Sequence, residues 1–138
     1  DLAIHKFVKN IAHDKQVVLF GDGSTARDYT YIDDTVSGIF NALQFCLKNT
    51  DLYTIVNLGN NKPVKLKDLV DVIYTGMGKA KNIVYDAMQP GDVEITFADI
   101  TKAQALFGYK PATNLATGIG KFIDWFNTVE KEKKVNME

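Results

Sequence analysis

Apolar residues recur along this chain at two alternating spacings, and each spacing predicts a different kind of element. Steps of three and four residues predict amphipathic helices, and short β-prone runs closed by glycine or asparagine predict strands. The helices are expected over residues 2–14, after Asp33 and Asp34 to Leu47, from Leu66 to Gly78, from Thr101 to Gly108, and from Leu115 to Phe126. The strands are expected at residues 17–20, 28–32, 53–58 and 82–85. Helix takes the larger share, so the sequence predicts an α/β or α+β fold. Its few short strands are expected to be parts of a larger sheet or of two small ones.

Particular side chains are expected to define the ends and faces of these helices. Asp33 and Asp34 are expected to cap the second helix at its positive end. Thr101 and Gln104 have the spacing of a capping box at the start of the fourth helix. The single cysteine, Cys46, falls on the apolar side of the second helix, which predicts a buried and inert thiol.

Length and charge narrow the class of protein. A chain of 138 residues predicts one domain, residues 1–138, in which the charged run at 130–138 forms a frayed, solvated end. The net charge of −1 gives no electrostatic case for binding nucleic acid or an anionic membrane, and no apolar run is long enough to span a bilayer. One cysteine suits a reducing, cytoplasmic setting. The chain begins at Asp1 without a methionine, so we expect it to be a piece of a longer protein.

Several kinds of chemistry have no basis in the sequence. The two histidines, His5 and His13, are separated by about 12 Å along one predicted helix, which is too far for one metal ion. No Walker loop is present, and Gly21-Asp22-Gly23 lacks the third glycine and the opening helix of a dinucleotide-binding loop. No serine, histidine and aspartate set suggests a triad. The sequence therefore favours a binding part over a complete catalyst, with no catalytic, cofactor-binding or metal residues.

Arg27 is the only arginine of the chain, whereas the other fifteen basic residues are lysines. A guanidinium group binds carboxylate or phosphate with two parallel hydrogen bonds, which a lysine cannot do. Its position after a glycine-rich turn favours a phosphate-binding role. A surface arginine, or a structural partner of Asp28, is the alternative.

Five segments, taken in order, resemble the C-terminal half of NAD-dependent nucleotide-sugar epimerases of the extended short-chain dehydrogenase/reductase family. These segments are Val18–Asp34, Ile55–Asn60, Met88–Val93, Ala98–Ala103 and Leu106–Pro111. The wording of the third segment is most similar to the UDP-glucuronate 4-epimerase branch. The resemblance implies a helix-rich α/β substrate domain of a Rossmann-type enzyme, incomplete without its N-terminal half.

The resemblance also implies what this half does. It would bind a UDP-sugar such as UDP-glucuronate, while NAD and the catalytic Tyr-x-x-x-Lys pair would belong to the absent N-terminal half. The chain alone would then be inactive, and the parent enzyme would be a cytoplasmic homodimer.

Seven substrate-binding residues follow from the resemblance. Val18, Leu19 and Phe20 would line the uracil end, and Phe20 would pack near the base. Arg27 would bind the diphosphate. Asp92 would lie on the ribose side, Thr96 would complete that wall, and Gln89 stands where many UDP-galactose 4-epimerases have a second phosphate-binding arginine.

Simpler roles for these residues, and other functions for the chain, stay open at this point. Phe20 could belong to the core, Asp92 to a turn, and Thr96 to an ordinary strand. A dehydratase or decarboxylase of the same fold, a non-catalytic nucleotide-sugar-binding module and a plain scaffold domain are the alternative functions.

Overall fold

The computed structural model describes residues 3–135, with side chains through residue 132. The chain divides into two compact units. The first unit combines Asp1–Ser24, Leu66–Asp92 and Asn114–Glu138, and the second combines Thr25–Lys65 and Val93–Thr113. No helix among the described residues is long and apolar enough to cross a membrane.

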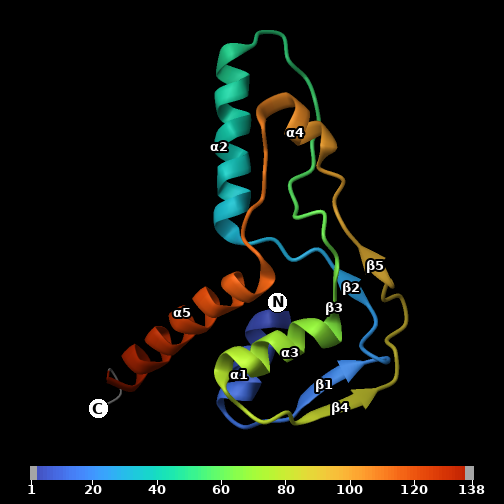
Figure 1. The fold of residues 1–138 in the computed structure, drawn as a ribbon, viewed down its shortest axis with the longest axis vertical. Helices are drawn as coiled ribbons and strands as arrows, with labels where there is room; N and C mark the ends of the chain where they lie inside the picture. Colours follow the sequence, from blue (N-terminus) through green and yellow to red (C-terminus); the bar gives the residue numbers. More distant parts are fainter. Residues whose placement is uncertain (1–2, 136–138) are drawn as a thin grey trace. The chain divides into compact units, whose positions relative to one another are not determined.

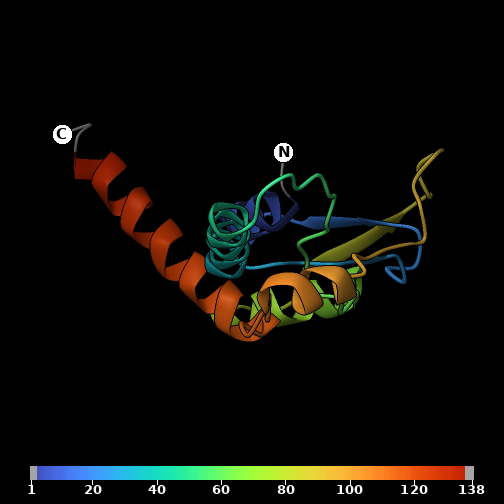
Figure 2. The same ribbon diagram turned by 90° about the horizontal axis from the view of Figure 1, so that it is seen from above.

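The first unit packs three helices with a pair of parallel strands (Figure 1, Figure 2). Its helices are α1 (Ala3–Ala12), α3 (Leu66–Met77) and α5 (Leu115–Val135), and its strands are β1 (Val17–Phe20) and β4 (Ile83–Asp86). β1 and β4 run side by side, with Val17 opposite Ile83 and Phe20 opposite Asp86. α3 packs against both α1 and α5.

The buried side chains of the first unit agree with the apolar spacings that predict its helices and its first strand. Val17 and Leu19 are fully buried while Val18 between them is 38% exposed, as expected for a strand with one face on the core. The helices contribute further side chains with less than 2% exposure, namely Val8, Ile11, Leu69, Val70 and Ile73. A Cβ at Gly76, near the end of α3, would lie 2.9 Å from Ile123 Cδ1. The glycine therefore permits close packing of α3 on α5.

The second unit contains a small mixed sheet and two helices (Figure 1). β2 (Ala26–Arg27) is the central strand, antiparallel to β3 (Val64–Lys65) and parallel to β5 (Ile95–Thr96). α2 (Ile32–Lys48) packs with α4 (Thr101–Phe107). The buried cluster consists of Ile100, Ala103 and Tyr109, and the side chains packed on it are Val56, Leu58, Ala98 and Phe107.

Two predicted strands of the second unit are wrong. Residues 28–31 form no regular element, and the strand lies two residues earlier, at Ala26–Arg27. Residues 52–58 also form no strand. β-prone residues signal side chains that fit a half-buried surface, and Val56 and Leu58 meet that need by packing on the buried cluster.

Both predicted helix caps are also wrong. The N-cap of α2 is Tyr31, and Asp33 and Asp34 lie in the first turn. The carboxylate of Asp34 accepts instead from the backbone N–H groups of Ala112 and Thr113, at 3.0 Å each. At α4 the N-cap is Ile100, without a side-chain bond.

The aspartate just before α4 supplies the bond that the capping box was expected to make. Asp99 accepts the N–H of Thr101 at 2.9 Å. The predicted stop at Gly108 is confirmed, because its φ of 68° is left-handed and favours glycine.

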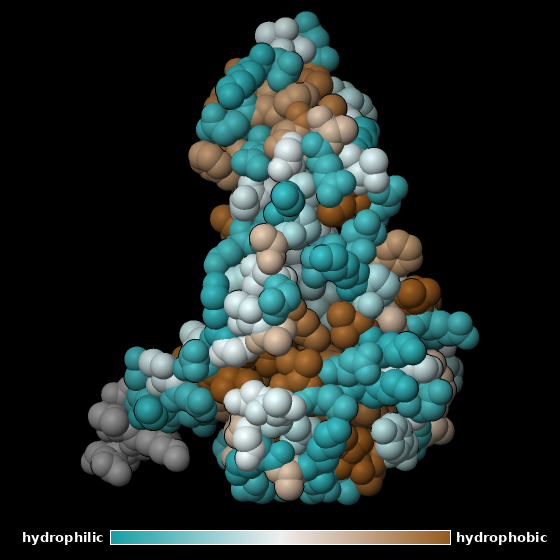
Figure 3. Space-filling model, viewed as in Figure 1, coloured by the Kyte–Doolittle hydropathy of each residue, from teal (hydrophilic) through white to brown (hydrophobic). Residues whose placement is uncertain are grey.

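The apolar stripe of α2 is present but does not form the core of its unit. Gly38 is the buried residue of this helix, whereas Val36, Phe40, Leu43 and Leu47 are each more than 50% exposed. Cys46 is also exposed, which corrects the prediction of a buried thiol. The face drawn in Figure 3 likewise shows apolar surface in each unit. Periodicity identifies the stripe, but only packing decides which side of the helix is covered.

α5 continues as helix through Val135, so part of the predicted frayed tail is helical. Residues 136–138 lie outside the described part of the chain, and fraying of the end stays a prediction.

Candidate functional site

Three of the predicted site residues lie on β1. Val18 is 38% exposed and Phe20 is partly buried, and strand alternation places both on the face opposite Leu19. The side chain of Leu19 is fully buried in the core. Any ligand contact from position 19 would therefore come from its backbone.

The turn after β1 is held in place by hydrogen bonds within the first unit. Gly21 and Gly23 have φ values of 67° and 74°, which favour glycine. The N–H of Gly21 donates to the backbone carbonyl of Asp86 at 2.9 Å. The carbonyl of Gly23 accepts from the N–H of Lys67 at 3.1 Å. The carboxylate of Asp22 accepts from the N–H of Ser24 at 2.9 Å. The hydrogen bonds from Ser24 lower the pKa of Asp22.

This turn does not continue as a phosphate-binding loop of the dinucleotide type. The residues that follow form β2, whereas a dinucleotide-binding loop opens a helix whose N-terminus meets the phosphates.

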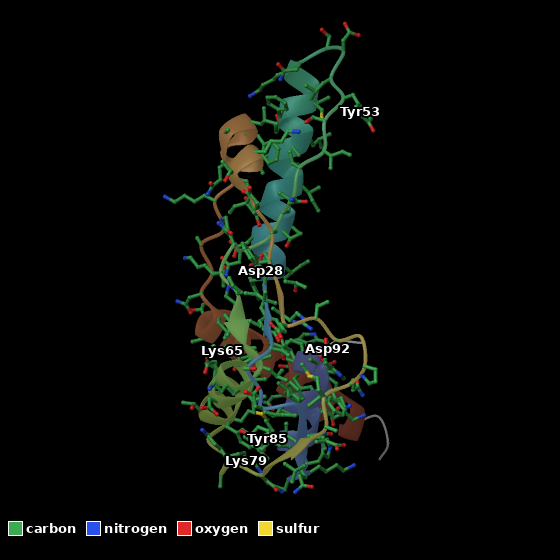
Figure 4. All side chains as sticks on the ribbon, turned by 90° about the vertical axis from the view of Figure 1, so that its right-hand side faces the viewer. Asp28, Tyr53, Lys65, Lys79, Tyr85 and Asp92 are labelled. Carbon is green, nitrogen blue, oxygen red and sulfur yellow. The ribbon has the colours of Figure 1, made fainter. Side chains whose placement is uncertain are left out.

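Gln89 and Asp92 lie together in the turn that follows β4. Figure 4 labels Asp92. The N–H of Asp92 donates to the carbonyl of Gln89 at 3.2 Å, and Gly91 has a φ of 84°. Both side chains are exposed. Because β4 ends at Asp86, opposite Phe20, this turn leaves the sheet from the same edge as the turn after β1. The carboxyl edge of parallel strands is where α/β proteins bind ligands.

Arg27 and Thr96 are paired in the second unit. They face each other in register on the parallel strands β2 and β5. Arg27 is partly buried and its Nη1 donates to the carbonyl of Ala26 at 2.8 Å. Burial raises the pKa of Tyr29, and the positive charge of Arg27 lowers it. Thr96 is exposed.

Asp28 has a structural role that the sequence did not reveal, since only a pairing with Arg27 was considered there. Its carboxylate accepts hydrogen bonds from the backbone N–H groups of Asn60, Asn61 and Ala98, at 3.0 to 3.1 Å. Figure 4 shows Asp28 just beyond the end of β2. Nothing in the sequence spacing connects the Gly59-Asn60-Asn61 turn to an aspartate more than 30 residues earlier.

A hollow of about 350 Å³ opens in the second unit beside these residues. It is lined by Asp28, Thr30, Asn57, Leu58, Gly59, Thr96, Phe97 and Ala98. Thr96 is the predicted site residue among them. Hydroxyl, amide and carboxylate groups therefore surround a space adjoining the β2–β5 pair.

Among the described residues, no group of three or more histidine, cysteine, aspartate or glutamate side chains is placed to hold a metal ion.

A family model described as GDP-mannose 4,6 dehydratase matches residues 2–122. The chain belongs to this family. An uncharacterized protein of Methanocaldococcus jannaschii is 41% identical over 126 residues, which are 91% of this chain and 37% of that protein. UDP-glucuronate 4-epimerase 5 of Arabidopsis thaliana is 41% identical over 139 residues, covering 91% of this chain and 32% of the relative.

Solved structures of the family share the fold. UDP-glucuronic acid 4-epimerase of Bacillus cereus, solved in complex with UDP-glucuronic acid and NAD, is 31% identical with a TM-score of 0.85. That comparison covers 94% of this chain and 40% of the epimerase. The α/β fold matches the C-terminal portion of such epimerases, which confirms the fold prediction. The chain spans about a third of the length of the curated relatives it matches.

Proposed function

We propose that this chain is the UDP-sugar-binding part of an NAD-dependent nucleotide-sugar epimerase that acts on UDP-glucuronate or a close analogue. The observation that carries the proposal is the pairing of Arg27 with Thr96 on β2 and β5, in a fold shared with an epimerase solved with UDP-glucuronic acid. A guanidinium group on a short, hydrogen-bonded strand is suited to bind a diphosphate, because its planar donors match two phosphate oxygens.

Each remaining site residue has a role in this proposal that fits its place. Val18 and Phe20, on the outward face of β1, contact the uracil ring, and Leu19 contributes through its backbone. Asp92 accepts hydrogen bonds from ribose hydroxyls, and Gln89 lies in the same turn. Thr96 adds a hydroxyl group next to Arg27.

The chemical step is proposed to lie elsewhere in the full-length protein. No tyrosine of this chain is followed by a lysine four residues later, and the glycine turn at residues 21–23 leads into a strand. The residues present therefore do not fit NAD, which accepts and returns a hydride in such epimerases. Binding energy from the nucleotide, remote from the reacting carbon, would hold UDP fixed so that the sugar alone turns.

Isothermal titration of the full-length protein with UDP-glucuronate, UDP and uridine tests this proposal. We expect saturable binding of UDP-glucuronate and UDP, and weaker binding of uridine, which lacks the phosphates. Absence of saturable UDP binding would contradict the proposal and favour a scaffold domain.

A dehydratase is the second candidate, because the matching family model is described as one. Mass spectrometry of the products separates the two. An epimerase gives a product of unchanged mass, whereas a dehydratase gives a product lighter by one water and a decarboxylase one lighter by carbon dioxide. Unconverted substrate that nevertheless binds would indicate a non-catalytic module. A homodimeric parent and a cytoplasmic location stay predictions.

A further inference from the structure

One carboxylate joins separate stretches of the second unit. Asp28 accepts from Asn60 N–H at 3.1 Å to both oxygens, from Asn61 N–H at 3.0 Å and from Ala98 N–H at 3.1 Å. Hydrogen bonds to a charged group are stronger than those between neutral groups. Asp28 thus fixes the backbone of the 59–61 turn and the segment just after β5.

The backbone of the 59–61 turn lies so close to this carboxylate that no side chain fits between them at position 59. A Cβ at Gly59 would lie 2.6 Å from Asp28 Oδ2 and 2.5 Å from the Cβ of Ala98. Any residue other than glycine at position 59 would therefore clash with the carboxylate of Asp28. The carbonyl of Gly59 also accepts from the Tyr109 hydroxyl at 2.9 Å, so the turn is held from a second direction.

These bonds act on the two residues proposed to meet the ligand. Arg27 directly precedes Asp28, and Thr96 lies two residues before Ala98. The β2–β5 pairing joins only the register pairs Ala26–Ile95 and Arg27–Thr96 within the described residues. So short a ladder has little stability of its own. The carboxylate closes the end of that ladder and fixes the two backbones relative to each other.

We propose that Asp28 is a positioning residue, which holds Arg27, through its pairing with Thr96, in the geometry that binds the diphosphate. This inference rests on the proposed function and assigns no ligand contact to Asp28 itself. Its effect passes through the backbone of β2 and β5.

A double-mutant cycle in the full-length protein tests the inference, with UDP and uridine as probes in isothermal titration. We expect Asp28→Asn to weaken UDP binding by about tenfold, because a misaligned Arg27 guanidinium group loses part of its charge-assisted hydrogen bonding to the phosphates. The asparagine side chain keeps one acceptor oxygen but replaces the other with an NH2 donor, which then faces a backbone N–H group that needs an acceptor. Uridine affinity should change by less than about twofold, because uridine carries no phosphate for Arg27 to bind.

The cycle adds Arg27→Ala alone and combined with Asp28→Asn. If Asp28 acts through Arg27, the double variant should bind UDP within about twofold of Arg27→Ala, since coupled residues give non-additive losses. The matched control is Asp51→Asn, an exposed aspartate of the same unit whose φ of 55° asparagine also tolerates. It should leave both affinities unchanged.

Three outcomes would each overturn the inference while leaving the proposed function intact. They are additive losses of UDP affinity in the double variant, equal weakening of UDP and uridine binding by Asp28→Asn, and a UDP affinity of Asp28→Asn equal to that of Asp51→Asn. Failure of the wild type to bind UDP would overturn both. If Asp28→Asn does not fold, Asp28→Glu keeps the acceptor oxygens but shifts them. Selective loss of UDP affinity in that variant would support the role, and an equal change for uridine would refute it.

Discussion

The hydroxyl of Tyr109 donates a hydrogen bond of 2.9 Å to the carbonyl of Gly59, 50 residues earlier in the chain. Tyr109 is 1% exposed and belongs to the buried cluster of the second unit. Burial raises the pKa of Tyr109, with further increases from the negative charges of Asp34 and Asp28. The hydroxyl therefore stays protonated and donates at neutral pH.

Replacing Tyr109 by phenylalanine should remove this bond and leave the Gly59 carbonyl without its donor. We expect the free energy of unfolding to fall by about 1 kcal/mol, the usual net worth of such a bond. Urea denaturation measures the change. Tyr53→Phe is the matched control, because Tyr53 is 92% exposed, and an equal loss in both variants would contradict the structure.

Gly38 should not tolerate alanine although it lies within a helix. A Cβ there would lie 2.8 Å from Leu58 Cδ2 and from the ring of Tyr109. We expect Gly38→Ala to destabilise the protein by about 1–3 kcal/mol through overpacking.

Gly120 in α5 is the matched control for Gly38. A Cβ at Gly120 meets nothing within 4 Å, so Gly120→Ala should stabilise by up to about 1 kcal/mol through helix propensity. Thermal melting of both variants checks the opposite signs. Melting-temperature shifts of the same sign in the two variants would refute the close contact of Gly38 with Leu58 and Tyr109.

The stability contribution of Asp99 should depend on pH in the acid range. Hydrogen bonds from Thr101, first from its side chain and then from its backbone, lower the pKa of Asp99 below its ordinary value. A lowered folded-state pKa means that the contribution is fully present above the unfolded-state pKa and disappears as pH falls through the lower, folded value. Thr101→Ala should therefore raise the pKa of Asp99.

Carboxyl-carbon NMR titration measures that pKa directly. Thr75→Ala, an exposed threonine of α3, should leave it unchanged. An Asp99 pKa unaffected by Thr101→Ala would show that the side-chain bond contributes nothing.

Arg27 should matter for ligand binding through its shape as well as its charge. A charge-assisted bond is worth roughly 1.5–3 kcal/mol, so Arg27→Ala should weaken UDP binding by about tenfold to 100-fold. Arg27→Lys should recover only part of the loss, since an ammonium group lacks the planar fork.

Isothermal titration of the full-length protein compares these variants with Lys110→Ala, an exposed lysine of the same unit. Equal UDP affinities in Arg27→Ala and Lys110→Ala would rule out the diphosphate contact.

Local pattern was enough to place the elements whose side chains pack close to their own segment. The strand Val17–Phe20, the helix beginning at Leu66 and the helix stop at Gly108 follow from a short apolar run closed by glycine, from helical spacing and from the left-handed freedom of glycine. The ordered motifs also sufficed to indicate the family, because they occur over most of the chain.

Tertiary structure decided what depends on partners distant in sequence. Asp34 binds residues 78 and 79 positions away instead of capping its helix, and Asp28 binds N–H groups 33 and 70 positions away. α2 buries Gly38 and exposes its apolar stripe, because close approach to Tyr109 requires the absence of a side chain. Spacing along a sequence records which face of an element is apolar. Which face is covered, and which carboxylate finds which N–H group, is fixed only when segments far apart in the chain are packed together.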